Sequence, residues 1–344
     1  MEWLVPIMDG RVTGHCNHDM KWTCTICGNR VLNVIIKNAK SVGSQYDIYY
    51  CDQCMVGKTT PVIPPADLAK LYSREVYRSE TGKRFHGPIE KVIYIWRLHR
   101  KKRIEKHAGK GKILDIGCGR GLFLDIMRTH GWTVMGVEFG QEAVEDASNA
   151  YGIEVIEETR MRSTLLDEEF DVITMNHVLE HVYNPVETIH ECSRTLKNGG
   201  LLVISVPNIL SWQASFGNRD WFHLDPPYHL HHFSEQGLTK LLQNHSFSIQ
   251  EVRRFDWEYN IFGWLQTLLN RAGIRKNLFY DSLKMKILRT KQFPGRTGWG
   301  LFWTVILLPF MAPLALMLSL AESYLLNKGG TIEIYATKSR DLPG

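Results

Sequence analysis

Four cysteines near the start of the sequence have the spacing of metal ligands. Cys24 and Cys27 form one Cys-x-x-Cys pair, and 23 residues separate it from a second pair, Cys51 and Cys54. Two such pairs with β-like runs between them are typical of a zinc ribbon, in which four thiolates surround one Zn²⁺ ion. We therefore predict a zinc site at these cysteines. The ion is expected to be structural, because four thiolates leave no open coordination position.

A glycine-rich turn is the second group of residues whose spacing indicates chemistry. A β-like run ends near Asp115, glycines follow at positions 117, 119 and 121, and a helical pattern begins at Leu122. Glycines let a backbone turn tightly and approach a ligand, and a helix N-terminus offers N–H groups to polar or anionic ligands. The next β-like run ends at Glu138, and an acid there can hold both hydroxyls of a ribose. The segment therefore predicts a nucleoside-binding site.

The spacing of these glycines distinguishes two cofactors. A dinucleotide fingerprint, Gly-x-Gly-x-x-Gly, would place its third glycine at position 122, which is Leu122. The segment Asp115–Gly121, Asp-x-Gly-x-Gly-x-Gly, resembles instead motif I of the class I methyltransferases, which bind S-adenosylmethionine. Two later segments resemble the same family in the same order. Glu169–Pro185 is similar to its fourth strand and the loop after it, and Leu196–Asn208 is similar to its fifth strand.

The resemblance covers residues 112–256 and 331–338 and implies an α/β fold. The expected core is a Rossmann-like methyltransferase sheet of seven strands, with the last strand inserted antiparallel. Glu138 is expected to hold the ribose, and Asn176 and His177 are expected beside the sulfonium end of S-adenosylmethionine. The family positions imply the following cofactor-binding residues: Asp115, Gly117, Cys118, Gly119, Gly121, Glu138, Glu158, Asn176 and His177.

His177, Glu180 and His181 allow several interpretations. Their His-x-x-Glu-His pattern formally matches a class of zinc proteases, but here it follows a strand instead of lying on a helix. The O-methyltransferases of ubiquinone biosynthesis, which this segment resembles, have an acid-x-x-Glu-His there that can hold a divalent cation. This sequence has His177 in place of that acid. A magnesium site and a glutamate–histidine pair that orders the loop both stay open.

A histidine-rich segment, Tyr228–Ser234, resembles the part of these methyltransferases that precedes the helix before strand six. Methyl transfer to a hydroxyl needs a base with a pKa near neutral, which suits histidine. We therefore take His181, His229 and His232 as candidate catalytic residues. The alternative is that Ser234 caps a helix and that the histidines pack locally.

The elements that must position these residues alternate along the chain. The alternation predicts βαβ units and a parallel sheet. Strands are expected at 112–116, 132–138, 153–156, 170–176, 200–206 and 247–255, and helices at 120–130, 140–150, 185–197 and 234–245. The predicted domains are 1–60, the zinc ribbon; 61–111, a linker and leader helices; 112–256 with 331–340, the methyltransferase core; and 257–330, a helical insertion.

The insertion combines basic and apolar residues. From Asn270 to Arg296 there are eight basic residues and one acid, and Trp299–Ala321 follows without a charged residue. As a helix, these 23 residues would span roughly 35 Å, enough for a bilayer. The last strand must return to the sheet, and Pro309 and Pro313 are predicted to break the run into two arms. The alternatives are a hairpin at an anionic membrane surface and a helical hairpin packed on protein.

Composition is close to the average for a soluble globular protein. The 344 residues are 44% hydrophobic and 22% charged, which excludes wholesale disorder and a polytopic membrane protein. The first ten residues hold two acids and no apolar run, so we expect no signal peptide. A net charge of +5 is too small to argue for nucleic acid as a partner.

The expected function is methyl transfer from S-adenosylmethionine to a small-molecule, glycan or lipid-linked acceptor, at a hydroxyl oxygen. The protein is expected in the cytoplasm, peripheral or monotopic at the inner face of the membrane. Two alternatives stay open: an RNA methyltransferase that uses the zinc ribbon to recognise RNA, and a non-catalytic module that binds S-adenosylmethionine.

Overall fold

The computed structural model describes residues 22–31, 33–41, 43–64, 67, 87–283 and 294–339. Within these ranges, the side chains at positions 22, 31, 87 and 294–297 are not described. Four of the eight basic residues of the predicted window lie outside the described residues, namely Lys284, Lys286, Arg289 and Lys291.

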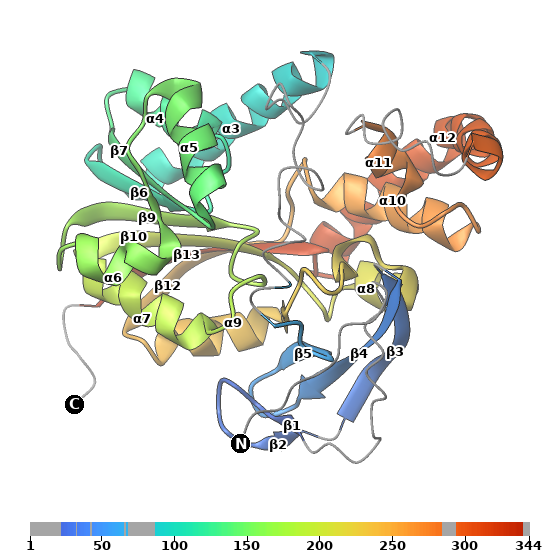
Figure 1. The fold of residues 1–344 in the computed structure, drawn as a ribbon, viewed down its shortest axis with the longest axis horizontal. Helices are drawn as coiled ribbons and strands as arrows, with labels where there is room; N and C mark the ends of the chain where they lie inside the picture. Colours follow the sequence, from blue (N-terminus) through green and yellow to red (C-terminus); the bar gives the residue numbers. More distant parts are fainter. Residues whose placement is uncertain are drawn as a thin grey trace.

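The centre of the protein is a seven-stranded sheet with the strand order β12-β13-β10-β9-β6-β7-β8 (Figure 1). Strands β6 to β10 run parallel, and β13 is antiparallel to both of its neighbours, β10 and β12. The predicted sheet with an inserted antiparallel last strand is confirmed. Its strands are β6 (Lys112–Ile116), β7 (Thr133–Glu138), β8 (Val155–Glu157), β9 (Phe170–Asn176), β10 (Leu196–Pro207), β12 (Phe247–Arg253) and β13 (Thr331–Lys338).

Helices cover both faces of this sheet, which explains why its central strands are apolar throughout. In β10, for example, every residue from Leu201 to Pro207 is buried. Figure 1 shows α3, α4 and α5 on one face and α6, α7 and α9 on the other. Their bounds are α3 (Gly87–His107), α4 (Leu122–Thr129), α5 (Gln141–Tyr151), α6 (Met161–Thr164), α7 (Pro185–Thr195) and α9 (Glu235–Gln243).

The N-terminal strands form a smaller sheet that takes in one strand from the core. The order is β11-β5-β4-β3, with β3 (Asn33–Ser41), β4 (Ser44–Cys51), β5 (Val56–Thr60) and β11 (His231–Phe233). A separate two-stranded ladder joins β1 (Trp22–Thr23) to β2 (Arg30–Val31). Strand β11 pairs antiparallel with β5. The histidine-rich segment therefore forms an edge strand of the N-terminal sheet, although in sequence it belongs to the core. The sequence did not predict this pairing.

The insertion between β12 and β13 is helical. It contains α10 (Asn260–Arg271), α11 (Leu278–Leu283), α12 (Pro294–Leu320) and a π-helical turn, η4 (Ala321–Leu325). Between β10 and β11 the chain forms three short helices, namely α8 (Trp212–Gly217), η2 (Asn218–Asp220) and η3 (Phe222–Leu224).

The prediction that two prolines divide the apolar run was wrong. Helix α12 continues through Pro309 and Pro313. Each proline removes one backbone hydrogen bond, but both lie four residues apart on the exposed face. On the opposite face Met311 and Ala315 pack with Trp264 of α10, and this packing is uninterrupted.

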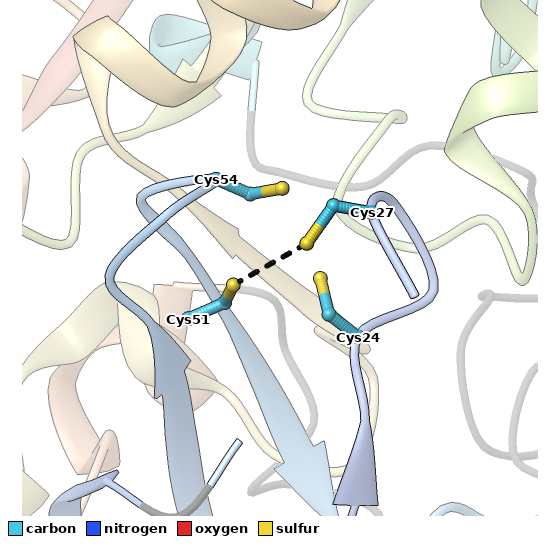
Figure 2. Close-up of side chains that lie close together, drawn as sticks. All are labelled: Cys24, Cys27, Cys51 and Cys54. Carbon is cyan, nitrogen blue, oxygen red and sulfur yellow. Dashed lines mark hydrogen bonds between the residues drawn. The ribbon is translucent and has the colours of Figure 1, made fainter. Parts of the chain in front are cut away.

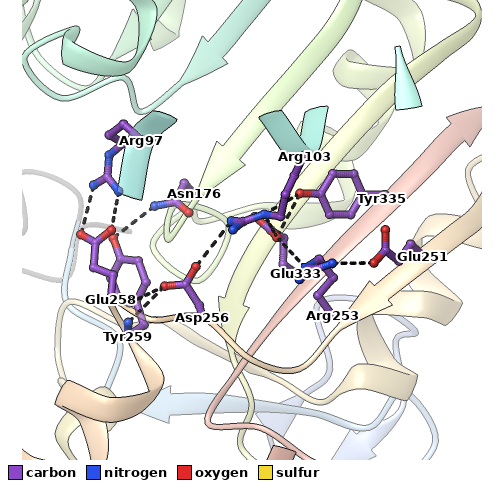
Figure 3. A network of polar contacts seen from close by, with 10 residues as sticks. All are labelled: Arg97, Arg103, Asn176, Glu251, Arg253, Asp256, Glu258, Tyr259, Glu333 and Tyr335. Carbon is purple, nitrogen blue, oxygen red and sulfur yellow. Dashed lines mark hydrogen bonds and ion pairs between the residues drawn. The ribbon is translucent and has the colours of Figure 1, made fainter. Parts of the chain in front are cut away.

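Helix α3 joins the sheet to the start of the insertion through ion pairs (Figure 3). Arg97 makes two hydrogen bonds to the carboxylate of Glu258. One turn and a half further on, the Arg103 guanidinium lies 3.5 Å from Asp256 and 3.2 Å from Glu333 of β13. The connection after β12 is therefore held by ion pairs at two points along α3.

We expect Arg97→Ala to lower the free energy of unfolding by about 2 to 3 kcal/mol, because it leaves Glu258 with an uncompensated, largely buried charge. The side chains of Arg97 and Glu258 are each only 16% exposed. Urea denaturation followed by circular dichroism measures the change. The control is Arg128→Ala, which breaks an exposed pair with Asp125 and should cost less than about 1 kcal/mol. Equal losses in the two variants would contradict this account.

Candidate active site

The glycine-rich turn leaves β6 in a backbone conformation that requires glycine. Gly117, Gly119 and Gly121 have φ values of 71°, 62° and 82°. A Cβ atom on Gly117 would lie 2.3 Å from a methyl group of Val178, so the loop after β9 packs directly on the turn. A Cβ atom on Gly119 would meet nothing within 4 Å, which leaves open space above the backbone at this point. The turn therefore combines tight packing on one side with room for a ligand on the other.

Glu138 at the end of β7 holds this turn through its carboxylate. The Gly119 N–H donates a hydrogen bond of 2.5 Å to one oxygen, and the Phe139 N–H donates one of 3.0 Å to the other. The Glu138 side chain is buried. A carboxylate accepts about four hydrogen bonds. Glu138 thus places a charged hydrogen-bond acceptor directly at the turn, the kind of group that holds adjacent ribose hydroxyls.

Asp115 lies below the turn at the end of β6. Its carboxylate accepts a 2.5 Å hydrogen bond from the Thr174 hydroxyl on the neighbouring strand β9. Burial raises the pKa of Asp115 to about 6. Burial therefore disfavours the charged form of Asp115, which lies beside the expected position of the cofactor.

The residues that end β9 contact the insertion. Asn176 donates a 3.2 Å hydrogen bond to the Tyr259 hydroxyl, and the His177 ring lies 3.8 Å from the Tyr259 ring. His177 has a φ of 54°, a conformation uncommon outside glycine and asparagine. Tyr259 was not predicted as a site residue. It lies just before α10, and no pattern in the sequence links that position to the loop after β9.

The other two predicted cofactor residues have different surroundings. Cys118 is buried, its N–H donates to the Val137 carbonyl at 3.1 Å, and its sulfur lies where a Cβ atom on Gly136 would clash. Glu158 begins the short helix η1 (Glu158–Arg160) after β8 and is exposed.

Glu180, His181 and His229, which we name the histidine–glutamate group, come together from the loop after β9 and the segment before β11. Each offers a ligand atom, and these atoms all lie within 4.8 Å of one another. The backbone carbonyl of Glu180 accepts from the N–H groups of Leu230 and His231, which ties the two loops together. Burial lowers the pKa of His181 and of His229 to about 4, so both imidazoles are neutral at pH 7.

His232 faces the four-cysteine ribbon. The Thr59 hydroxyl on β5 donates to the His229 carbonyl at 2.6 Å and lies 2.9 Å from His232 Nε2. Because that hydroxyl has one proton, it must accept from His232 Nε2–H. The ribbon therefore fixes the ring of His232 and the backbone of His229 with a single side chain.

Cys24, Cys27, Cys51 and Cys54 converge at one end of the ribbon (Figure 2). Their sulfur atoms lie within 4.8 Å of one another, and those of Cys27 and Cys51 are 3.7 Å apart. None of the four forms a disulfide. The donor set and its spacing suit a tetrahedral zinc ion.

The fold and the turn define the class of the core, and comparisons with known proteins agree. Residues 89–252 match the family model described as a methyltransferase domain. Over 172 residues the chain is 27% identical to a probable S-adenosylmethionine-dependent methyltransferase of Mycobacterium tuberculosis, covering 48% of this chain and 60% of that protein. Over 162 residues it is 32% identical to the ubiquinone biosynthesis O-methyltransferase of Klebsiella pneumoniae, covering 45% of this chain and 66% of that protein. The chain thus spans less than two thirds of the length of these relatives.

Solved structures align with this chain at low similarity. That of a putative sarcosine dimethylglycine methyltransferase from Galdieria sulphuraria has a TM-score of 0.47 and 13% identity, over 81% of this chain and all of that one. The family match and the curated relatives show that residues 89–252 are a methyltransferase domain of the class that uses S-adenosylmethionine.

The residues of the turn fit that cofactor. Open space at Gly119 and the acid at Glu138 match a ribose bound against the turn, and Asn176 and His177 lie at the end of β9, the strand next to β6. A ligand in this position would lie at the carboxyl ends of parallel strands, where ligands bind in open α/β sheets.

Glu138→Gln should weaken the binding of S-adenosylmethionine by about 10- to 100-fold, because a charged acceptor for two hydroxyls is lost. Isothermal titration calorimetry gives the dissociation constant. Glu154→Gln, an exposed acid before β8, serves as the matched control and should leave the constant unchanged. Unfolding temperatures of both variants would show whether the turn is intact. An unchanged affinity in folded Glu138→Gln would refute this role.

Asp115 makes a pH-dependent contribution to stability. Its pKa is raised from 3.8 to about 6, so between these values the folded chain keeps a proton that the unfolded chain has lost. The stability of the cofactor-free protein therefore falls as pH rises through this window, by about 3 kcal/mol for this group. Asp115→Asn removes that loss. We expect the variant to gain stability relative to the native chain between pH 4.5 and pH 7, measured by urea denaturation at both values. A constant difference between the two proteins would contradict the assignment.

Proposed function

We propose that the protein transfers the methyl group of S-adenosylmethionine to a hydroxyl oxygen of a small-molecule, glycan or lipid-linked acceptor at the cytosolic face of a membrane. The observation that carries this proposal is the contact between the glycine turn and the loop that bears the histidine–glutamate group. Through Val178 and Gly117, the expected cofactor site and a cluster of neutral imidazoles lie on adjacent loops.

The cofactor supplies an electrophilic methyl group when it is bound. Glu138 would hold its ribose, while Asp115, Gly117, Gly119 and Asn176 would orient the nucleoside and the sulfonium end. The acceptor hydroxyl must lose its proton as its oxygen bonds to carbon. His181 and His229 are neutral at pH 7 and near the turn, so they are the residues proposed to handle that proton. His232, fixed by Thr59, would hold their loop in position.

The four-cysteine site is proposed to hold a structural Zn²⁺ ion. The ion would keep β4 and β5 in place, since Cys51 ends β4 and Cys54 precedes β5. Strand β5 in turn carries Thr59 and pairs with β11. The ribbon would therefore act on the reaction only by positioning the loop of His229.

Helix α12 supports a location at the membrane. Residues Gly298–Leu325 have a mean hydropathy of 2.2 in an 18-residue window, of which only 11% is buried. A core helix of similar composition would be largely covered. Because β13 begins at Thr331 and returns to the central sheet, both ends of the helix belong to the same folded body. We infer that α12 lies in the membrane interface and does not cross the bilayer.

Basic and aromatic side chains gather near the C-terminal end of this helix. A shallow pocket there is lined by His99, Lys102, Arg103, Lys106, Arg253, Phe255, Trp257 and Tyr324. Trp257 and Tyr324 are more than half exposed. Basic groups favour anionic headgroups, and tryptophan and tyrosine are enriched at the membrane–water boundary. The pocket therefore favours an anionic lipid surface over a neutral one.

The test of the function is turnover with S-adenosylmethionine labelled in its methyl group, incubated with lipid, glycan and RNA extracts. Label in the lipid or glycan fraction, in a product with an O-methyl group, is the expected result. His229→Gln should lower kcat by about 100-fold while cofactor affinity stays unchanged. Label confined to RNA would replace the proposal by an RNA methyltransferase, and absence of any turnover would favour a non-catalytic binding module.

A variant with Val305→Glu, Phe310→Glu and Met317→Glu should lose most of its binding to vesicles that contain phosphatidylglycerol. These three side chains of α12 are 69%, 74% and 60% exposed, and burying a charge there removes the apolar contact. Co-sedimentation with vesicles measures the effect. Leu166→Glu, at a position that is equally exposed but far from α12 in the sequence, should bind as the native protein does. Native protein that stays in the supernatant would contradict membrane attachment.

A further inference from the structure

The shallow pocket near the C-terminal end of α12 combines basic groups and aromatic rings in a space suited to one anionic group. We propose that it binds the phosphate of a single anionic phospholipid, as a headgroup site separate from the apolar surface of α12. The proposal deepens the proposed function, because the choice of a membrane lipid as the ligand rests on the attachment of α12 to the membrane. The binding of a phosphate group itself depends only on the residues of the pocket.

Helix α3 contributes a repeated basic pattern to the pocket. His99, Lys102 and Lys106 are three and four residues apart, and residues at these intervals share one face of a helix. All three side chains are exposed, and the two lysines form no ion pair with any residue in the described ranges. Two ammonium groups are therefore available to an anion that approaches from outside.

Arg103 and Arg253 form another part of the lining, and a carboxylate fixes both. Glu333 of β13 lies 3.2 Å from Arg103 and 3.9 Å from Arg253 (Figure 3). The Arg253 Nε atom is buried and has no hydrogen-bond partner among the described residues. A guanidinium has five N–H groups, so pairing with one carboxylate leaves donors for a second anion. No acid is among the described residues that line the pocket, so its surface is positively charged.

Three aromatic rings form the apolar part of the lining. The Phe255 ring lies 5.0 Å from the Trp257 ring and 5.7 Å from the Tyr324 ring, between centroids. Trp257 and Tyr324 are each more than half exposed, as are the next two residues of the chain, Leu325 and Leu326. A soluble phosphate ester has no apolar part that could contact these side chains, whereas a phospholipid has its acyl chains. This apolar surface is the reason for choosing a lipid over a free phosphate.

The size of the pocket agrees with a single headgroup. Its volume of about 290 Å³ is at the lower end of the range for small-molecule sites. Lysine and arginine side chains bind phosphate oxygens through charge-assisted hydrogen bonds. A single-stranded nucleic acid instead needs a basic groove that follows its backbone over several nucleotides. The pocket therefore favours one phosphate group over a run of them.

The pocket and the exposed face of α12 belong to one continuous segment, because Tyr324 lies in η4, which directly follows α12. The apolar residues of α12 favour any bilayer, whatever the charge of its headgroups. The basic residues of α3 favour negatively charged headgroups. We expect α12 to provide attachment and the pocket to provide the preference for anionic lipid.

The direct test uses dihexanoyl-phosphatidylglycerol below the concentration at which it forms micelles, so that no membrane is present. Calorimetric titration of the native protein should show saturable binding of this lipid. Lys102→Ala/Lys106→Ala should weaken the binding by at least about 10-fold, since one hydrogen bond to a charged group contributes that much. Dihexanoyl-phosphatidylcholine should bind at least about 10-fold more weakly to the native protein, because its choline group neutralises the phosphate charge.

Two control variants show where the lipid binds. Lys91→Ala/Lys110→Ala removes the same charge from exposed lysines, one on α3 and one just after it, that do not line the pocket. This variant and the α12 variant with three glutamates should both bind the soluble lipid as the native protein does. Equal losses in the two double-lysine variants, loss of binding in the α12 variant, or equal binding of the two lipids to native protein would each overturn the proposal.

Two further titrants identify the source of the phosphate. Inorganic phosphate should bind at least about 10-fold more weakly than dihexanoyl-phosphatidylglycerol, because it makes no apolar contact. Phosphate that binds as tightly as the lipid would refute a lipid ligand in favour of a soluble phosphate ester. A short RNA that binds more tightly than the lipid, and loses this binding in Lys102→Ala/Lys106→Ala, would refute it in favour of nucleic acid.

Vesicles and labelled methyl donor separate this inference from the proposed function. Lys102→Ala/Lys106→Ala should co-sediment less with phosphatidylglycerol vesicles than native protein does, and equally with phosphatidylcholine vesicles. Selective binding of the soluble anionic lipid without methyl transfer would support the pocket and refute the methyl transfer. Methyl transfer by native protein that shows no preference for the anionic lipid would do the reverse.

Discussion

The hydrogen bond from the Gly119 N–H to the Glu138 carboxylate joins the ends of two adjacent strands, and the rest of the site depends on it. It sets the turn in a conformation that only glycines adopt easily, with φ near 60° to 80°. It also fixes the acid that is proposed to hold the ribose. Because Gly117 then packs on Val178, the position of the loop after β9 follows from the same turn. The glycine turn and the loop that bears Glu180 and His181 are thus in direct contact.

Three segments that are distant in sequence support this element. The ribbon reaches the site through Thr59 and the pairing of β5 with β11, and the insertion reaches it through Tyr259. Helix α3 secures the insertion with Arg97 and Arg103. Burial of Asp115 opposes stability in the cofactor-free protein, as is common where function requires a charged group in a poorly solvated place. The contacts made by the ribbon, the insertion and α3 offset the stability lost by burying Asp115.

The sequence predicted the elements whose signals are local. Glycines at 117, 119 and 121, the acid at 138 and the apolar runs of the sheet each depend on neighbours within a few residues, and the seven-stranded sheet was confirmed. The cysteine pairs were found by spacing alone, and they converge as expected. Ser234 caps α9 by accepting from the Gly237 N–H, in agreement with the local alternative considered for that segment.

Contacts between distant segments could not be predicted in this way. Strand β11 is only three residues long, and its partner β5 lies some 170 positions earlier, so no periodicity reveals the pairing. Tyr259 reaches the site from the segment just before α10, which has no motif. The continuity of α12 depends on packing against α10, which outweighs the effect of two prolines on an exposed face. The expectation of a break at the prolines was wrong because the packing of α12 against α10 keeps the helix continuous.

The central claim is that the turn after β6 is shaped for a sulfonium nucleoside and not for a pyrophosphate. Calorimetric titration of the native protein with S-adenosylmethionine and, separately, with NAD tests it directly. The account predicts saturable binding of S-adenosylmethionine at one site per chain and no measurable binding of NAD. Binding of NAD, or absence of heat with S-adenosylmethionine in a folded sample, would contradict it.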